Sequence, residues 1–172
     1  PFWNKNNWRL NDSRLGSCLT ELNVHDIDVM QHIFGLPTSL SCHIKSISTP
    51  NDFASSEFHY GNFSVTILSE WLSSKDKFCM SYEVIFENGT LVFDGNVVFF
   101  KENNGNINLI SLSDKDGIVN EIEYFIKVLL GETNNDINPP EQSAHTLYLI
   151  ERCFESAEQN GAILDICSFD LL

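Results

Sequence analysis

Four ionisable side chains recur along one stretch of the sequence at spacings that bring them to one side of a helix. They are Glu21, His25, Asp28 and His32, at positions i, i+4, i+7 and i+11. Residues three or four apart on a helix are neighbours, so each side chain is within reach of the next. A carboxylate can accept one imidazole N–H, fix the tautomer and leave the other nitrogen ready to take a hydroxyl proton. The spacing is therefore typical of an acid–base site centred on His25, with Glu21 and Asp28 beside it.

Two other interpretations of these residues stay open. The four side chains can form the polar face of an amphipathic helix, stabilised by contacts between residues four apart. Alternatively, Glu21, His25 and Asp28 offer ligand types that suit zinc or another divalent ion. No further Cys or His cluster completes a set of ligands, so we predict no metal site, although spacing alone does not exclude one.

The stretch that carries these residues has the pattern of a helix. Apolar residues recur at helical spacing over residues 15–34, and Gly35 followed by Pro37 is a typical stop. The same reasoning predicts helices over residues 118–130 and about 141–160. For the last helix we expect an apolar stripe of Leu147, Ile150, Phe154 and Ala157.

Between the helices the hydrophobic period falls to two, which is the pattern of strands. Alternation predicts strands over residues 40–45 and 65–71, with a polar loop over 48–56 between them. A meander of short strands follows, in which Asn88-Gly89 is expected to supply the positive-φ pair of a tight hairpin turn. Its strands are predicted at residues 80–86, 91–93, 97–100 and 107–112, with a last edge strand at 162–166.

These elements predict an α+β fold with an open, mostly antiparallel sheet and helices packed on one face. Leu68, Ile85 and Ile47 place apolar side chains on the other face, which is then available for self-association. A length of 172 residues suits one domain, and 42% hydrophobic content suits a well-filled core.

Charge and cysteine usage exclude several classes of partner. A net charge of −14, without a cluster of Lys or Arg, predicts no binding to nucleic acid or to an anionic membrane. Five irregularly spaced cysteines indicate free thiols and a cytoplasmic protein. The sequence contains no G-x-G-x-x-G motif, so we expect the main site of any dinucleotide cofactor to lie elsewhere.

Three segments follow one another in an order that resembles a known family. Trp8-Arg9 through Gly16 leads into Leu19–Met30, with the sequence LTELNVHDIDVM, and then into Ile33-Phe34-Gly35-Leu36-Pro37. This block resembles the opening of the C-terminal domain of Gfo/Idh/MocA-type oxidoreductases, where a Gly-rich start precedes D-x-G-x-H-x-x-D, an apolar run and Gly-x-Pro. The order of later segments is also similar, so the resemblance covers most of residues 8–166.

The resemblance implies roles for particular residues. His25 stands at the position of the family's acid/base, which removes the substrate's hydroxyl proton while hydride passes from the same carbon to a nicotinamide ring. Glu21 stands where the family has a catalytic Asp, and Asp28 matches the later acid that orients the histidine. Asn23 stands where the family has Gly. Trp8, Arg9 and His32 are the candidates for contact with the substrate.

On this resemblance, residues 1–172 are a single C-terminal domain for substrate binding and oligomerisation, and an N-terminal Rossmann domain binds NAD or NADP. The implied protein is a dehydrogenase or reductase acting on a sugar, sugar derivative or cyclitol, assembled as a homodimer or tetramer through the sheet. We expect this chain alone to be inactive. The alternative is a non-catalytic ligand-binding or oligomerisation module with the same fold. The sequence does not name the substrate, the direction of reaction or the choice between NAD and NADP.

Overall fold

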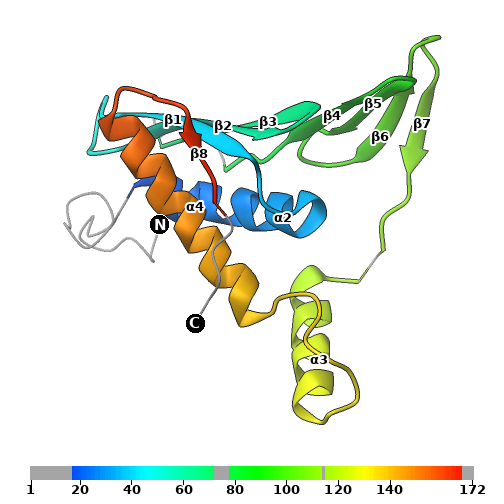
Figure 1. The fold of residues 1–172 in the computed structure, drawn as a ribbon. Coiled ribbons are helices and arrows are strands. Elements are labelled where there is room, and N and C mark those ends of the chain that lie inside the picture. Colours follow the sequence, from blue (N-terminus) through cyan, green and yellow to red (C-terminus); the bar gives the residue numbers. More distant parts are fainter. Residues whose placement is uncertain (1–16, 72–77, 114, 168–172) are drawn as a thin grey trace. The chain divides into compact units, whose positions relative to one another are not determined.

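A computed structural model describes residues 17–71, 78–113 and 115–167 and confirms the α+β fold (Figure 1). Its strands form two four-stranded antiparallel sheets, in the orders β3-β2-β1-β8 and β4-β5-β6-β7. The strands are β1 (Ser39–Lys45), β2 (Phe53–Tyr60), β3 (Phe63–Glu70), β4 (Tyr82–Phe86), β5 (Gly89–Phe93), β6 (Val98–Glu102), β7 (Ile107–Ile110) and β8 (Leu164–Asp165). The helices are α2 (Val24–Phe34), preceded by a π-helical turn at Leu19–Asn23, α3 (Gly117–Leu129) and α4 (Pro140–Glu158).

The two sheets belong to two compact units. The first unit contains β1, β2, β3 and β8 with helices α2 and α4, and the second contains β4 to β7 with α3. In the first unit both helices lie on the same face of the sheet (Figure 1). The candidate residues of the sequence analysis that the structure describes therefore all lie in the first unit.

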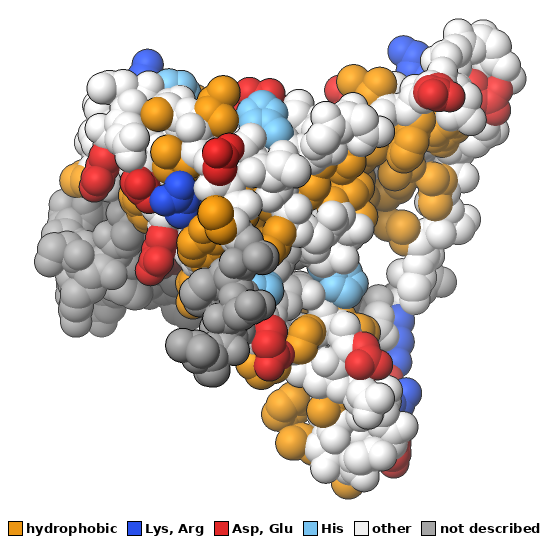
Figure 2. All heavy atoms as spheres, viewed as in Figure 1, with side chains coloured by type: hydrophobic (Ala, Val, Ile, Leu, Met, Phe, Trp, Pro, Cys, Tyr) orange, Lys and Arg blue, Asp and Glu red, His pale blue; other side chains and the backbone are white. Residues whose placement is uncertain are grey.

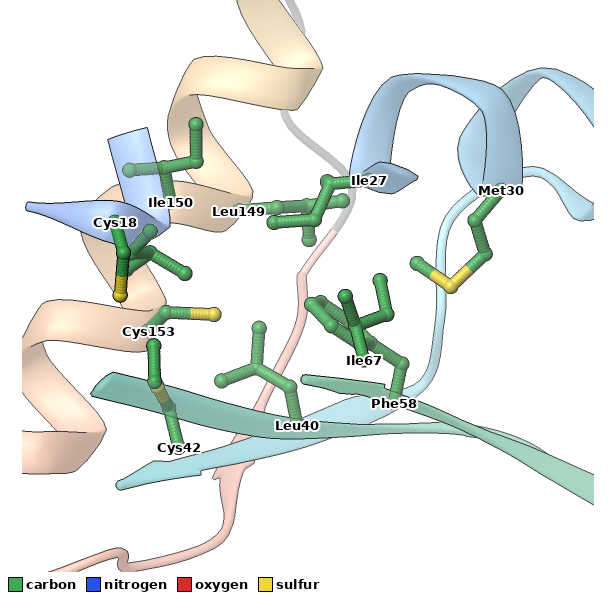
Figure 3. Close-up of a cluster of buried hydrophobic side chains, with 12 residues drawn as sticks. Cys18, Ile27, Met30, Leu40, Cys42, Phe58, Ile67, Leu149, Ile150 and Cys153 are labelled. Atoms are coloured by element: carbon green, nitrogen blue, oxygen red, sulfur yellow. The ribbon is translucent and has the colours of Figure 1, made fainter. Parts of the chain in front are cut away.

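The core of the first unit lies between its sheet and its two helices (Figure 3). The strands direct alternate side chains inward, as the period of two requires. Burying these apolar groups supplies most of the stability that fixes α2 on the sheet. The core residues are Leu40, Cys42, Ala54, Phe58 and Ile67 from the strands, Cys18, Leu19, Ile27 and Met30 from the first helical stretch, and Leu149, Ile150 and Cys153 from α4.

The predicted polar loop over residues 48–56 is wrong in its second half. Strand β2 begins at Phe53 and pairs along its whole length with β1 and β3. Two of its inward positions are the small residues Ala54 and Ser56, so the alternation is weak in the sequence. The Ser56 hydroxyl reaches a partner in the core, because it donates to the Cys42 sulfur at 3.2 Å.

The predicted first helix is confirmed over the described residues from Cys18 to Phe34. Its beginning contains a π-helical turn, in which the Val24 N–H donates to the Leu19 carbonyl, five residues back. π-Helical turns inside helices are rare and occur frequently at functional sites. The apolar spacing over residues 15–34 predicts a regular helix and does not predict this turn.

The predicted meander in the second unit is also confirmed, with one correction at its first hairpin. The turn falls on Glu87 and Asn88, and Gly89 is already the first residue of β5, without a positive φ. The predicted Asn88-Gly89 positive-φ pair is therefore wrong. Gly89 is required for a different reason: a Cβ there would lie 2.4 Å from the Lys101 carbonyl oxygen.

The second unit exposes many of its apolar side chains. On β4 and β7, Ile85 is 79% exposed and Leu109 is 74% exposed, and α3 has no buried residue. Figure 2 shows hydrophobic side chains at the surface over the strands of this unit and over α3. Leu68 and Ile47 of the first unit are exposed as predicted, but most outward side chains of that sheet's strands are polar. Examples are Ser41, His43, Ser55, Glu57, His59 and Thr66.

Candidate functional site

Helix α2 presents a polar flank away from the core. Its buried positions include Ile27, Met30 and Gln31, which fix one side of the helix against the sheet and α4. His25 and His32 are exposed, and Asp28 between them is half-buried. The helix therefore carries these three side chains outside its buried stripe.

Asp28 makes its described hydrogen bonds to α4. Its Oδ1 accepts from the Thr146 hydroxyl at 2.8 Å and from the Gln142 side-chain Nε2 at 3.5 Å. His32 reaches the same glutamine, because its Nδ1 lies 3.2 Å from Gln142 Oε1. The structure thus brings Asp28 and His32 together through Gln142.

Thr146 is the most buried member of this group, at 3% exposed. Besides Asp28 Oδ1, its hydroxyl oxygen lies 3.0 Å from Gln31 Oε1 and 3.1 Å from the Gln142 carbonyl oxygen. A threonine hydroxyl has one proton, so it donates to one of these oxygens at a time. The side chains of α2 and α4 are therefore coupled through one shielded hydroxyl.

The ring of His25 has a different environment. None of the described residues forms a hydrogen bond with it in this structure, and its neighbour in the chain, Asp26, interacts with it electrostatically. Burial raises the pKa of the Asp26 carboxyl, and the nearby His25 charge offsets part of that increase. Sequence spacing assigns no role to Asp26. Its interaction with His25 makes it a carboxyl near the imidazole that sequence reasoning missed.

Of the other predicted site residues, the structure describes Glu21 but not Trp8 or Arg9. Glu21 is half-buried in the π-helical turn. Trp8 and Arg9 lie outside the described residues. Asn23, at the position of the family's Gly, is fully buried, and neither its amide oxygen nor its amide nitrogen has a hydrogen-bond partner among the described residues.

Sequence reasoning missed Gln142 and Thr146 because the predicted apolar stripe of the last helix is only partly correct. Ile150 is buried and Phe154 packs against the core, but Leu147 is 60% exposed. The buried side of α4 consists of Thr146, Leu149, Ile150, Cys153 and Ser156. That stripe has equally good helical spacing, and choosing it would have placed Thr146 against the core.

The geometry of the described residues bears on two further ligands, a metal ion and a dinucleotide. Within the described ranges, no three His, Cys, Asp or Glu side chains come together as metal ligands, so the metal interpretation gains no support. The start of α3 is occupied by the Asp116 carboxylate, which accepts from the Ile118 N–H. Helix α4 begins at Pro140, which lacks an N–H, and Glu141 adds negative charge. Neither helix start fits a dinucleotide pyrophosphate.

Two surface hollows lie away from the residues of α2. One hollow is lined by Glu87, Asn88, Phe100 and Glu102, all of the second unit, and another by the loop residues 46–50. Neither includes a residue of α2.

None of the described helices is long and apolar enough to span a bilayer.

Comparison with known proteins bears on the fold and the family. The model of the GFO/IDH/MocA C-terminal domain matches residues 1–92, slightly more than half of the chain. None of the curated protein sequences compared with the chain matches it.

Solved structures share the fold at low sequence identity. A Klebsiella pneumoniae protein is 18% identical with a TM-score of 0.75, and the match covers 92% of this chain and 52% of that one. A UDP-N-acetylglucosamine 3-dehydrogenase from Acidithiobacillus ferrooxidans is 14% identical with a TM-score of 0.74, and the match covers 88% of this chain and 50% of that one. An oxidoreductase from Agrobacterium radiobacter, solved with NAD+, L-tartaric acid and magnesium, is 15% identical with a TM-score of 0.70. The match covers 86% of this chain and 48% of that one.

The chain spans about half the length of these solved structures. At these identities the likeness shows the fold, and the family follows from the match over residues 1–92. The resemblance seen in the sequence is therefore confirmed. The chain belongs to the GFO/IDH/MocA family of oxidoreductases, in which it corresponds to the C-terminal domain.

Proposed function

We propose that this chain supplies the acid–base histidine and part of the substrate site of an NAD(P)-dependent oxidoreductase that acts on a sugar, sugar derivative or cyclitol. The observation that carries the proposal is the position of His25. Its imidazole is exposed on a helix whose opposite side is fixed in the core by Leu19, Ile27 and Met30. A reactive group on a rigid element can be held accurately against a substrate.

The chemistry of the site follows from its residues. The His25 ring takes the proton of the hydroxyl group under oxidation, and nearby carboxyl groups stabilise the charge that the ring gains. When bound, a nicotinamide cofactor would accept the hydride from the same carbon. We infer that NAD or NADP is held mainly by a separate dinucleotide-binding domain, because the starts of α3 and α4 do not fit a pyrophosphate. The chain alone is then inactive.

Other residues of the predicted site complete the proposal. Glu21 and Asp28 keep their proposed roles beside His25, and Trp8, Arg9 and His32 their proposed roles in substrate contact. A sugar derivative as substrate is consistent with the activity named for the Acidithiobacillus ferrooxidans relative. The described cysteines are free thiols, which suits a reducing compartment such as the cytoplasm.

The test is turnover by the full-length protein with a panel of sugars, nucleotide sugars and cyclitols, each with NAD and with NADP. We expect His25→Asn to lower kcat by about 10²-fold or more, the typical worth of a general base. His59→Asn, a matched change on β2, should leave kcat unchanged. If His25→Asn retains full turnover, His25 is not the base. Ligand binding without turnover by the wild-type protein would instead favour the non-catalytic module.

We also propose that the protein self-associates through its sheet. The register of β4 to β7 places Val92, Phe99 and Leu109 in one row across neighbouring strands. Ile85 and Ile107 lie on the same face, and both are exposed. An exposed apolar face of this kind is typical of a surface that another subunit covers. Sedimentation of the full-length protein should show a dimer or tetramer that Leu109→Lys dissociates, whereas Thr66→Lys on β3 should not.

A further inference from the structure

The side chain of Gln142 lies between two polar groups of α2. It is half-buried in the first turn of α4. Its Oε1 is 3.2 Å from His32 Nδ1 and its Nε2 is 3.5 Å from Asp28 Oδ1. Asp28 and His32 are four residues apart, so one amide spans two neighbouring positions on the helix.

The chemistry of each group fixes the direction of these contacts. A carboxylate accepts hydrogen bonds and an amide nitrogen donates them, so Asp28 turns the Gln142 Nε2 toward itself. The Oε1 of the same amide then faces His32, and an amide oxygen can only accept. His32 therefore carries a hydrogen on Nδ1, and the Nε2 of its neutral ring remains an acceptor.

Thr146 makes the first hydrogen bond in the series that leads through Asp28 and Gln142 to His32. Its buried hydroxyl, 2.8 Å from Asp28 Oδ1, holds the carboxylate against α4. The carboxylate orients the amide of Gln142, and the amide selects the tautomer of His32. His32 itself is exposed, so its Nε2 can meet a ligand.

We propose that Gln142 is a positioning residue that keeps the Nε2 of His32 free to accept a hydrogen bond from a second hydroxyl of the substrate. This substrate role rests on the proposed function of His25. His25 and His32 are seven residues apart, which corresponds to about 10.5 Å along a helix. A ligand that reaches both rings carries a donor hydroxyl well removed from its reacting carbon. Such a ligand is an extended polyol or sugar derivative.

The first test is the tautomer of His32, measured by long-range ¹H–¹⁵N correlation NMR of the 172-residue chain at about pH 8.5, where an ordinary imidazole is neutral. We expect the Nδ1–H form in the wild-type chain. Gln142→Ala should give a mixture of tautomers, and Gln142→Met, which keeps the length of the side chain, should do the same. Glu141→Ala, an exposed neighbour in the same turn, should leave the tautomer unchanged.

An Nε2–H tautomer in the wild-type chain would overturn the proposal, as would an unchanged tautomer in both Gln142 variants. This readout requires no turnover, so it stands or fails separately from the role of His25.

The second test is kinetic and uses the full-length protein. Loss of one hydrogen bond to the substrate is worth about 1 kcal/mol, so Gln142→Met should raise KM roughly fivefold and leave kcat nearly unchanged. His32→Ala should raise KM by at least as much. If His32 has the Nδ1–H form in the wild-type protein but KM is unchanged in Gln142→Met and His32→Ala, the substrate role of His32 is refuted. Loss of kcat in the Gln142 variants would refute a role in positioning alone.

Discussion

Thr146 on α4 and Asp28 on α2 are joined by a hydrogen bond of 2.8 Å between the Thr146 hydroxyl and the Asp28 carboxylate. The threonine is buried and the carboxylate is half-buried, so the bond is largely shielded from water. Helix α4 also packs on β1. The bond therefore connects the helix that carries His25 to the rest of the first unit.

Thr146→Val should lower the free energy of unfolding by about 1–3 kcal/mol, because it removes the hydroxyl that donates to the half-buried Asp28 carboxylate. Thr146→Ser keeps the hydroxyl and is the matched control. Urea denaturation measures both variants. Equal stability of the Val and Ser variants would show that the hydroxyl contributes little to the connection.

The fully buried Asp52 should stabilise the loop between β1 and β2. Its carboxylate accepts from the backbone N–H groups of Ile47, Ser48 and Thr49 at 2.6–2.8 Å. Asp52→Asn replaces one acceptor oxygen by a donor, so we expect the free energy of unfolding at pH 7 to fall by about 2 kcal/mol. An unchanged urea midpoint in Asp52→Asn would contradict this role.

The same residue gives a pH dependence with a definite sign. Burial alone would raise the pKa of Asp52, but the N–H groups of Ile47, Thr49 and Ser48 outweigh it and lower the pKa below its ordinary value. A lowered folded-state pKa adds stability above the unfolded value of about 3.9, and that stability is lost as the pH falls further. The difference in the free energy of unfolding between wild type and Asp52→Asn, measured by urea denaturation, should therefore shrink below about pH 4. A difference that grows there would contradict the assignment.

Asn23→Ala should stabilise the chain. The amide of Asn23 is fully buried and has no hydrogen-bond partner within residues 17–71, 78–113 and 115–167, and Ala has the higher helix propensity. We expect thermal and urea denaturation to show a gain of about 1 kcal/mol. Asn23→Gly, which restores the residue of the family pattern, should be less stable than the Ala variant because Gly costs about 1 kcal/mol in a helix. A loss of stability in Asn23→Ala would mean that the amide has a favourable role in the core.

Gly89→Ala should disrupt the second sheet. The added Cβ would lie 2.4 Å from the Lys101 carbonyl oxygen and 2.6 Å from the Phe100 ring, so β5 and β6 could not keep their pairing. Amide hydrogen exchange should show loss of protection in these two strands. Gly117→Ala is the control, because its Cβ meets nothing within 4 Å. Intact protection in Gly89→Ala would contradict the close approach of the strands.

Most elements of the fold could be predicted because their apolar periods are strong. The first helix, the meander and the last edge strand were found in this way. Strand β2 was missed because Ala54 and Ser56 occupy inward positions, where periodicity looks for larger apolar residues. The Gly89 turn was misread because an Asn-Gly pair indicates positive φ, whereas the close contact with Lys101 depends on a neighbouring strand.

The candidate site was predictable only along one helix. His25, Asp28 and His32 follow from spacing within α2, and the structure places them on its polar flank. Their partners Gln142 and Thr146 come from α4, more than 100 residues later in the chain. Contacts of that kind depend on how two helices pack, which the spacing within either helix does not determine.

The central claim is that the His25 imidazole performs proton transfer, and chemical rescue tests it most directly. In the full-length protein, His25→Ala should lower turnover by about 10²–10⁴-fold. Because the position is exposed, imidazole added to the solution should restore part of that turnover without affecting the wild-type protein. Full turnover by His25→Ala in the absence of added imidazole would contradict the claim.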